Sequence, residues 1–353
     1  MKKIKIIGND NVGWSIDKDN SNLTRFLSEI DEYRITDSYL FADIYFFVWH
    51  DLVLNPRYIY VRVLRTLSAL YGKRKKIIAW ITNDVSQSET FLRKKWPVDL
   101  WVSPSSLISD FLKKHLFPHV TIPFYVDSSV FKKLPDTKIA IASTLGISAD
   151  SIRDKVVIGS FQRDSSGSDL KAPKWQKNPD LLIRIVKQFP VDAYVLMLAG
   201  PRRHYMISRC KKEGIPFLFV GESSPINEGK DDIFINNMSE DVMNKLYNVS
   251  DLYIVTSSSE GGPKSILEGS LAGTLVCSTD VGLARDFLHE DLIYTEDRIE
   301  LVARIFKNIS HEKELDSKMH AYIDHNRALV MSSLEHGKYL SMIRNALTLL
   351  YVK

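Results

Sequence analysis

Two glutamates, Glu260 and Glu268, flank a glycine turn that suits the binding of a phosphorylated, hydroxyl-rich ligand. The apolar run before Glu260 is short enough for a buried strand, which ends at the polar residues that follow it. Gly261 and Gly262 let the backbone approach a ligand closely, and Pro263 suits the first position of a helix. Glu260 is therefore expected at the carboxyl end of a strand, and Glu268 near the end of the second helical turn.

The start of this helix favours an anion. Its free amides and the positive end of the helix dipole stabilise a negative group there by roughly 0.3 to 1 kcal/mol, so a phosphate fits. Two carboxylates would repel a phosphate, but each can accept hydrogen bonds from hydroxyls. The pattern therefore indicates a ligand with a ribose and a sugar on either side of its phosphates.

The stretch resembles the E-x7-E signature of the family 4 retaining glycosyltransferases, which have the GT-B fold. The resemblance rests on Glu260-Gly-Gly-Pro-Lys-Ser-Ile-Leu-Glu268, then Ala272-Gly273 and Thr279-Asp280-Val281-Gly282. It implies that Glu260 contacts the donor sugar in catalysis and that Glu268 binds the nucleotide ribose. It also implies that the turn Gly261, Gly262 and Pro263 contacts the diphosphate and sugar. The alternative is an ordinary strand and helix with two solvated glutamates.

Basic residues extend the resemblance. Arg163 and Lys177 look like the pair with which the family binds the diphosphate, since arginine offers a planar fork and lysine a point charge. The loop here is longer than is usual in the family and also contains Lys174, which is the alternative to Lys177. A basic loop that is merely solvated is the other interpretation.

The first part of the chain offers candidates for acceptor binding, because open α/β sheets place ligands at the carboxyl ends of their strands. We expect a strand at 3–7, a glycine turn, and a polar run before a helix at about 23–30. The acceptor candidates are Trp14, Asp17, Asn83 and Asp84. His50 resembles a position at which related enzymes hold a histidine near the sugar, and a structural histidine is an equal alternative.

No metal or other cofactor is expected. Asp17 and Asp19 imitate a DxD metal motif, but no strand precedes them and Lys18 separates them, whereas a hard cation needs converging oxygens on a firm scaffold. No cluster of His and Cys suggests zinc. The expected small-molecule partner is the nucleotide-sugar co-substrate that the resemblance implies.

The length of 353 residues favours two domains. We expect an α/β protein with two doubly wound Rossmann-like domains facing a central cleft, as in GT-B. Residues 1–135 are the expected acceptor-binding domain and 156–331 the nucleotide-sugar domain, with 136–155 as a linker or insertion. Helices within 332–353 are expected to cross back to the first domain.

Ser239 is expected to cap a helix, and the backbone amides near this cap are expected to read the nucleotide base.

Short apolar runs indicate the positions of the expected strands. The remaining strands are expected at 43–48, 76–81, 99–102, 156–161, 193–198, 217–220, 233–235, 251–256 and 274–278.

Positive charge is concentrated in residues 1–135, which have 20 Lys and Arg against 14 Asp and Glu. Within them, the basic segment from Arg57 to Lys76 has an apolar stripe at helical spacing, which packing on its own sheet would explain. Its cationic face also suits an anionic membrane surface, where each Lys or Arg adds about 1 kcal/mol. Nucleic acid is not an expected partner, since the charge excess is small and no reading module is present.

No apolar stretch approaches the length of about 18 residues needed for a membrane span, and the chain begins directly with a strand. Its two cysteines fit a reducing compartment. We therefore expect a cytoplasmic protein. Peripheral contact with the inner face of the membrane is the alternative left open.

The resemblance implies transfer of a sugar to a glycan or lipid-linked acceptor, with retention at the anomeric carbon and without a metal. Cell-surface polysaccharide or glycan synthesis is the expected setting. Two other classes stay open. One is a sugar-nucleotide epimerase or hydrolase of the same fold, and the other is a sugar-nucleotide-binding protein without catalysis.

Overall fold

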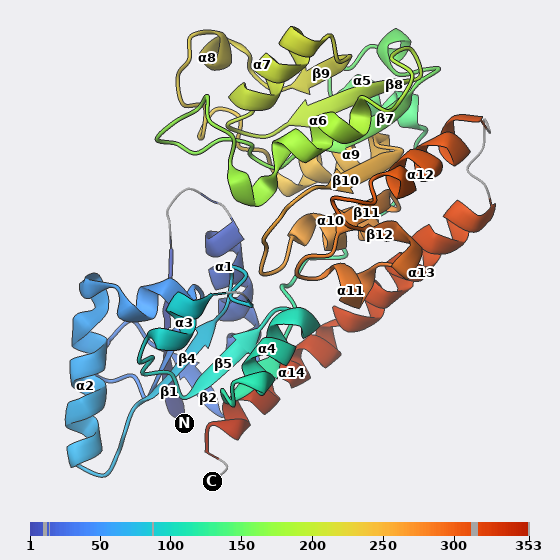
Figure 1. The fold of residues 1–353 in the computed structure, drawn as a ribbon. Coiled ribbons are helices and arrows are strands. Elements are labelled where there is room, and N and C mark those ends of the chain that lie inside the picture. Colours follow the sequence, from blue (N-terminus) through green and yellow to red (C-terminus); the bar gives the residue numbers. More distant parts are fainter. Residues whose placement is uncertain (10–12, 14, 87, 312–316, 352–353) are drawn as a thin grey trace. The chain divides into compact units, whose positions relative to one another are not determined.

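The computed structural model describes residues 1–9, 13, 15–86, 88–311 and 317–351. The chain forms two compact units, each built on its own sheet (Figure 1). The first unit comprises Met1–Tyr125, Glu260–Gly262 and Ser333–Lys353, and the second comprises Val126–Ser259 and Pro263–Ser332. The predicted fold class, two doubly wound Rossmann-like units, is confirmed.

The sheet of the first unit has six parallel strands in the order β2-β1-β3-β4-β5-β6. Its central strands are buried along nearly their whole length, as in parallel sheets that helices cover on both faces. The strands are β1 (Lys2–Ile7), β2 (Tyr33–Ile35), β3 (Ile44–Phe47), β4 (Lys76–Trp80), β5 (Leu100–Ser103) and β6 (His119–Thr121).

The second sheet is also six-stranded and parallel, in the order β12-β11-β10-β7-β8-β9. The order reverses between β7 and β10, and open α/β sheets bind ligands at such a switch point. The strands are β7 (Val156–Ser160), β8 (Tyr194–Ala199), β9 (Phe217–Val220), β10 (Leu252–Val255), β11 (Leu275–Thr279) and β12 (Ile293–Tyr294).

Helices connect the strands and follow the last of them. The first unit contains α1 (Ser15–Ser28), α2 (Ile59–Leu70), α3 (Glu89–Arg93), α4 (Ser106–Lys114) and α14 (His336–Leu349). The second contains α5 (Lys138–Thr144), α6 (Pro179–Val186), α7 (His204–Glu213), α8 (Ser224–Asn227), α9 (Glu240–Val249), α10 (Lys264–Ala272), α11 (Ala284–Phe287), α12 (Glu300–His311) and α13 (Ser317–Ser333).

Short 3-10 helices complete the chain at η1 (His50–Leu54), η2 (Pro56–Tyr58), η3 (Ala149–Ser151), η4 (Trp175–Lys177) and η5 (Glu290–Leu292).

The last helix of the chain, α14, packs within the first unit. Tyr339 on α14 is buried, and its hydroxyl donates a 2.8 Å hydrogen bond to the carbonyl of Pro123. Its ring lies 4.8 Å from that of Phe26 and 5.0 Å from that of Tyr125, measured between centroids. The first unit is therefore built from both ends of the described chain.

Two predicted elements were wrong. The helix α1 begins at Ser15 rather than near residue 23, because the polar run before Leu23 continues the same helix, with Asp19 buried and most of its neighbours half-exposed. Residues 233–235 form a turn instead of a strand. The amide of Ile233 donates to the side chain of Asp231, and Phe234 is 72% exposed, so this apolar run is not part of the core.

The boundary between the units follows Tyr125, ten residues before the predicted end at 135. The segment 136–155, predicted as a linker or insertion, forms α5 and η3, and α5 packs on α9 of the second unit. Its charged residues therefore belong to the surface of an ordinary helical layer.

Candidate functional site

The strand-turn-helix predicted around the two glutamates is present in the structure. The strand β10 is followed by the turn and by α10, which begins at Lys264 directly after Pro263. The helix ends at Gly273, whose φ of 78° is a conformation that favours glycine at helix ends. A Cβ at Gly269 would lie 2.8 Å from Val276 Cγ2, so the helix packs unusually close to β11.

Glu268 on α10 is held by a buried tyrosine. The hydroxyl of Tyr247, on α9, donates a 2.9 Å hydrogen bond to Glu268 Oε2. Burial raises the pKa of Tyr247 well above its usual value, and the nearby carboxylate of Glu268 adds to the rise. The tyrosine therefore remains a donor, and it orients the carboxylate that is predicted to bind the ribose.

The turn Glu260–Gly262 is grouped with the first unit by its contacts, while Pro263 and α10 belong to the second. Glu260 is partly exposed, and Gly261 and Pro263 are buried. Along the predicted catalytic turn, the chain therefore passes from the second unit to the first at Glu260 and back to the second at Pro263.

The basic residues predicted to bind the diphosphate follow β7. The main chain around Lys174 folds back on the start of this loop, with the Lys174 amide donating to the carbonyl of Asp164 at 2.7 Å. Lys177 lies in η4, and its carbonyl accepts a 3.0 Å hydrogen bond from the hydroxyl of Thr256, just after β10. Arg163, Lys174 and Lys177 therefore occupy one loop that is tied to the end of β10.

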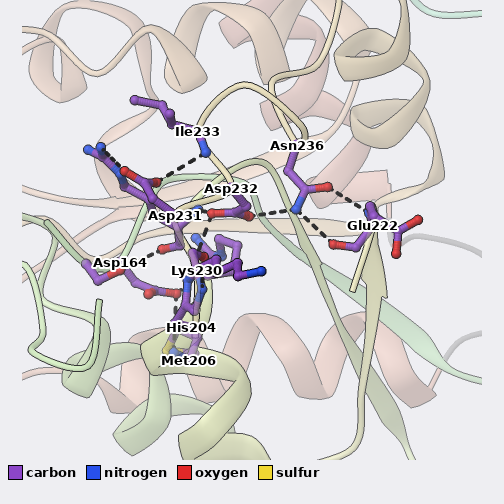
Figure 2. Close-up of polar contacts among 12 residues, drawn as sticks. Asp164, His204, Met206, Glu222, Lys230, Asp231, Asp232, Ile233 and Asn236 are labelled. Atoms are coloured by element: carbon purple, nitrogen blue, oxygen red, sulfur yellow. Dashed lines mark hydrogen bonds and ion pairs between the residues drawn. The ribbon is translucent and has the colours of Figure 1, made fainter. Parts of the chain in front are cut away.

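Asp164, which Figure 2 labels, belongs to a buried ion pair at the start of this loop. Arg203 is fully buried, and its Nε lies 3.3 Å from Oδ2 of Asp164. Asp164 is the residue that follows Arg163 in the sequence. The Nη2 group of Arg203 donates to the hydroxyl of Ser160, at the end of β7. Burial raises the pKa of Asp164 to about 7, and the guanidinium opposes the rise. These contacts join the loops that follow β7 and β8.

A second set of contacts joins the loop after β8 to the loop after β9. Asp232 is fully buried and accepts hydrogen bonds from the amide of Arg202 at 2.8 Å and from the side chain of Asn236 at 2.6 Å. Asn236 in turn accepts from the amide of Glu222 and donates to its carbonyl. Figure 2 shows Asp232 close to Asn236, with Glu222 on the other side of Asn236. We call the residues Asp164, Arg203, Asp232 and Asn236 the buried network.

The buried network was not predicted from the sequence. Two adjacent arginines at the end of β8 and two adjacent aspartates, Asp231 and Asp232, were the available signal. The second arginine and the second aspartate turn inward, whereas Arg202 pairs with Asp231 nearer the surface at 2.7 Å. Sequence alone did not show which member of each pair is buried.

The predicted cap at Ser239 is confirmed. Its hydroxyl accepts a hydrogen bond from the amide of Val242 at 3.3 Å, at the first turn of α9. Asn236, three residues before this cap, is a member of the buried network and donates a hydrogen bond to Asp232. The turn predicted to read the base and the loop predicted to bind the diphosphate therefore share one support.

His50, the second predicted catalytic residue, is buried in the first unit. Its side chain is 4% exposed, and its ring centroid lies 6.1 Å from those of Phe91 and Trp96. Burial lowers the pKa of His50 to about 4. In this conformation the imidazole is neutral near pH 7 and packs among aromatic rings, which favours the structural alternative.

Of the predicted acceptor residues, Asp17 lies in the first turn of α1, and Asn83 and Asp84 lie in the loop after β4. Asp17 accepts a 2.7 Å hydrogen bond from the amide of Gly13, and Asp84 accepts from the amide and hydroxyl of Ser86. Asn83 is exposed. Trp14 lies outside the described residues.

Within the described ranges, no group of three or more His, Cys, Asp or Glu residues is arranged to hold a metal ion. None of the helices that the structure describes has both the length and the apolar character needed to cross a membrane.

Comparison with known proteins gives the following matches. Residues 171–326 match the family model of glycosyl transferases group 1. No curated protein matches the sequence. HepE from Anabaena, solved in complex with UDP-glucose, is similar with a TM-score of 0.68 and 15% identity over 99% of both chains.

Two further solved structures share the fold. Sucrose-phosphate synthase from Thermosynechococcus elongatus has a TM-score of 0.67 and 12% identity over 99% of both chains. S. aureus TarM has a TM-score of 0.57 and 13% identity over 94% of this chain and 59% of its own. The matched segment contains α10 with Glu268 and most of the second unit. Residues 171–326 therefore resemble the glycosyl transferases of group 1, and the two units share the GT-B fold of these solved structures.

Proposed function

We propose that this protein transfers a sugar from a nucleotide-sugar donor to a glycan or lipid-linked acceptor, with retention at the anomeric carbon and without a metal. The observation that carries the proposal is Glu268, which lies eight residues after Glu260 on a helix of the matched segment and is oriented by Tyr247. The similar HepE structure, solved with UDP-glucose, makes that compound the first donor to test.

The donor would bind at the carboxyl ends of β7 and β10. Glu268 would accept hydrogen bonds from the ribose, and Gly261, Gly262 and Pro263 would contact the diphosphate and sugar. Arg163 and Lys177, or Lys174 in its place, would stabilise the charge that develops on the leaving diphosphate. Preorganised charges aimed at a leaving group are an effective source of rate enhancement.

In the reaction, the bond between the anomeric carbon and the diphosphate oxygen breaks, and the acceptor oxygen forms its bond on the same face of the sugar. The leaving diphosphate oxygen takes the acceptor proton, so charge and atoms balance. Glu260 holds the donor sugar during this step. Acceptor contacts are assigned to Trp14, Asp17, Asn83 and Asp84.

The setting that we propose is synthesis of cell-surface polysaccharide or glycan at the inner face of a membrane. Two observations support the membrane part: the net positive charge of residues 1–135 and the concentration of Lys and Arg between Arg57 and Lys76. A lipid-linked acceptor would be presented at such a surface.

Donor binding is tested by thermal unfolding of the parent and of two Glu268 variants with UDP, GDP, ADP and their sugars. Glu268→Ala removes the ribose contact but also leaves the buried hydroxyl of Tyr247 without its acceptor. Glu268→Gln keeps an acceptor for Tyr247 and removes the charge. The informative quantity is therefore the ligand-induced shift within each protein.

For the parent, a ligand at 100 times its dissociation constant adds about 2.7 kcal/mol to the free energy of unfolding. We expect one nucleotide family to give this shift, Glu268→Gln to give a smaller one and Glu268→Ala to give none. Equal shifts in all three proteins would remove Glu268 from the donor site.

Turnover separates the three classes of function. A transferase releases nucleoside diphosphate fastest when acceptor is present, and NMR of the product shows the anomeric configuration. A hydrolase or epimerase consumes the donor fully without acceptor, and a binding protein releases no diphosphate. Glu260→Gln is expected to lower transfer roughly 100-fold, and full activity in that variant would contradict the role of Glu260.

A further inference from the structure

The helix α2 presents an apolar face to solvent. The sequence predicted that its apolar stripe packs on its own sheet, but only part of it does. Val61 is buried, whereas Ile59 is 56%, Val63 50% and Leu70 77% exposed. Tyr60, Leu67 and Tyr71 are exposed as well.

These exposed residues form one continuous stripe. At 3.6 residues per turn, residues 59, 63, 67 and 70 fall on one side of a helix, with 60 and 71 beside them. The buried Val61 faces the opposite side and belongs to the hydrophobic core of the unit. Figure 1 shows α2 at the edge of the first unit. The helix therefore has apolar residues on two opposite sides. Packing against the core of the first unit explains the side with Val61 but not the exposed side.

Further apolar residues adjoin this stripe. The ring of Tyr39 meets that of Tyr60 edge-on, with 4.7 Å between centroids, and the Lys75 side chain donates to the carbonyl of Leu40 at 2.8 Å. Leu40 is 60% exposed, and the neighbouring Phe41 is exposed to the same degree. We call the α2 stripe together with Leu40 and Phe41 the α2 face.

The charged residues of the segment that contains α2 are of one sign. Seven Lys and Arg residues lie between Asp51 and Asp84 in the sequence, and no Asp or Glu lies there. Arg57, just before the helix, and Lys73 and Arg74, just after it, are exposed. The apolar stripe is thus bordered by cations at both ends.

From this arrangement we infer that the α2 face docks on an anionic lipid bilayer, with its apolar side chains entering the interface and its cations contacting lipid phosphates. The charge decides between occupants. A second copy of the chain would bring the same cations face to face, whereas an anionic bilayer complements them and accepts the apolar stripe. The inference gives the proposed membrane setting a defined surface.

The test is co-sedimentation of the full chain with vesicles, without donor or acceptor. Vesicles of phosphatidylcholine with 30 mol% phosphatidylglycerol, roughly the charge density of an anionic membrane, are compared with phosphatidylcholine alone. We expect binding to the anionic vesicles only, and weaker binding as salt is raised, because screening shortens the reach of charge.

Matched variants separate the apolar and cationic contributions. Val63→Glu/Leu70→Glu is expected to weaken binding at least tenfold, and Arg57→Gln/Lys73→Gln by roughly 5- to 25-fold, since each cation near the surface contributes about fivefold. The controls Val191→Glu and Lys211→Gln/Lys212→Gln change exposed residues of the second unit and should bind as the parent does. All these sites are exposed, so unchanged thermal unfolding should show that each variant is folded.

Three results would overturn the inference: no sedimentation of the parent with anionic vesicles, equal binding by the α2-face variants and their controls, or a concentration-dependent dimer of the parent that Val63→Glu/Leu70→Glu abolishes. The last would assign the face to a second copy of the chain. Because no sugar nucleotide is present, vesicle binding and the proposed transfer can fail independently.

Discussion

The loops at the carboxyl ends of the strands differ between the two sheets. In the second unit, the loops after β7, β8 and β9 are joined by the buried network, with Asp164, Arg203 and Asp232 removed from solvent. In the described part of the first unit, Asp84 accepts hydrogen bonds from Ser86 in its own turn, and His50 packs among aromatic rings. Buried charges need partners from fixed positions, so the second unit is built to hold its loops in one arrangement.

This difference supports the proposed division of ligands between the two units. A nucleotide diphosphate has a fixed shape and charge, and a preorganised set of loops binds it at a low entropic cost. In the first unit, the polar residues described after β3 and β4 are held by contacts within one turn or with aromatic rings. The proposed division, donor in the second unit and acceptor in the first, follows that contrast.

The largest expected effect is on the buried network. Arg203→Met leaves Asp164 buried without its cation, which should lower the free energy of unfolding by roughly 3 to 5 kcal/mol, measured by urea denaturation. The matched change in the first unit is Arg65→Met. Arg65 pairs with Asp99 at 2.8 Å, but both side chains retain 13% exposure and Asp99 keeps Arg74 as a partner.

We expect Arg65→Met to cost about 1 kcal/mol. If it costs as much as Arg203→Met, the contrast between the units is wrong. Because a buried pair is costly to form, the double variant Arg203→Met/Asp164→Leu should recover much of the loss. No recovery would mean that Arg203 acts through packing and not through its charge.

The next effect is the pH dependence that His50 gives the first unit. Burial lowers its folded pKa from 6.5 to about 4, so its contribution to stability is complete above pH 6.5 and is lost as the pH falls to 4. At about 1.36 kcal/mol per pKa unit, the loss is roughly 2 to 3 kcal/mol.

His50→Gln has no such titration, so its stability relative to the parent should rise by that amount between pH 7 and pH 4. Urea denaturation at a series of pH values measures the difference. The control is His320→Gln, at an exposed histidine of the second unit, which should follow the parent. A parallel course for His50→Gln and the parent would show that His50 is not buried in the neutral form.

The smallest effect concerns helix capping. Ser239→Ala removes the acceptor for the amide of Val242 and should cost about 1 kcal/mol. Ser88→Ala, in the first unit, removes a cap of the same type, with 3.1 Å between its hydroxyl and the amide of Phe91. That helix, α3, has only five residues, so we expect about half the cost. If Ser88→Ala lowers the free energy of unfolding more than Ser239→Ala does, the proposed difference between the loops of the two units is wrong.

Strands and the glutamate helix could be predicted from the sequence because their signals are local. Short buried runs mark most strands, and Pro263 and Gly273 mark the ends of α10. The buried network could not be predicted, because each member depends on a partner from another loop. The α2 stripe shows the same limit: helical periodicity identified an apolar face, but only the fold shows that Val61 is inside and Leu70 is not.

The return of α14 to the first unit has a consequence for synthesis. Residues 1–125 leave the ribosome well before Tyr339, whose ring packs against those of Phe26 and Tyr125. The second unit is continuous apart from the turn 260–262 and can complete its core earlier. The second unit should therefore complete its fold before the first, whose core needs α14.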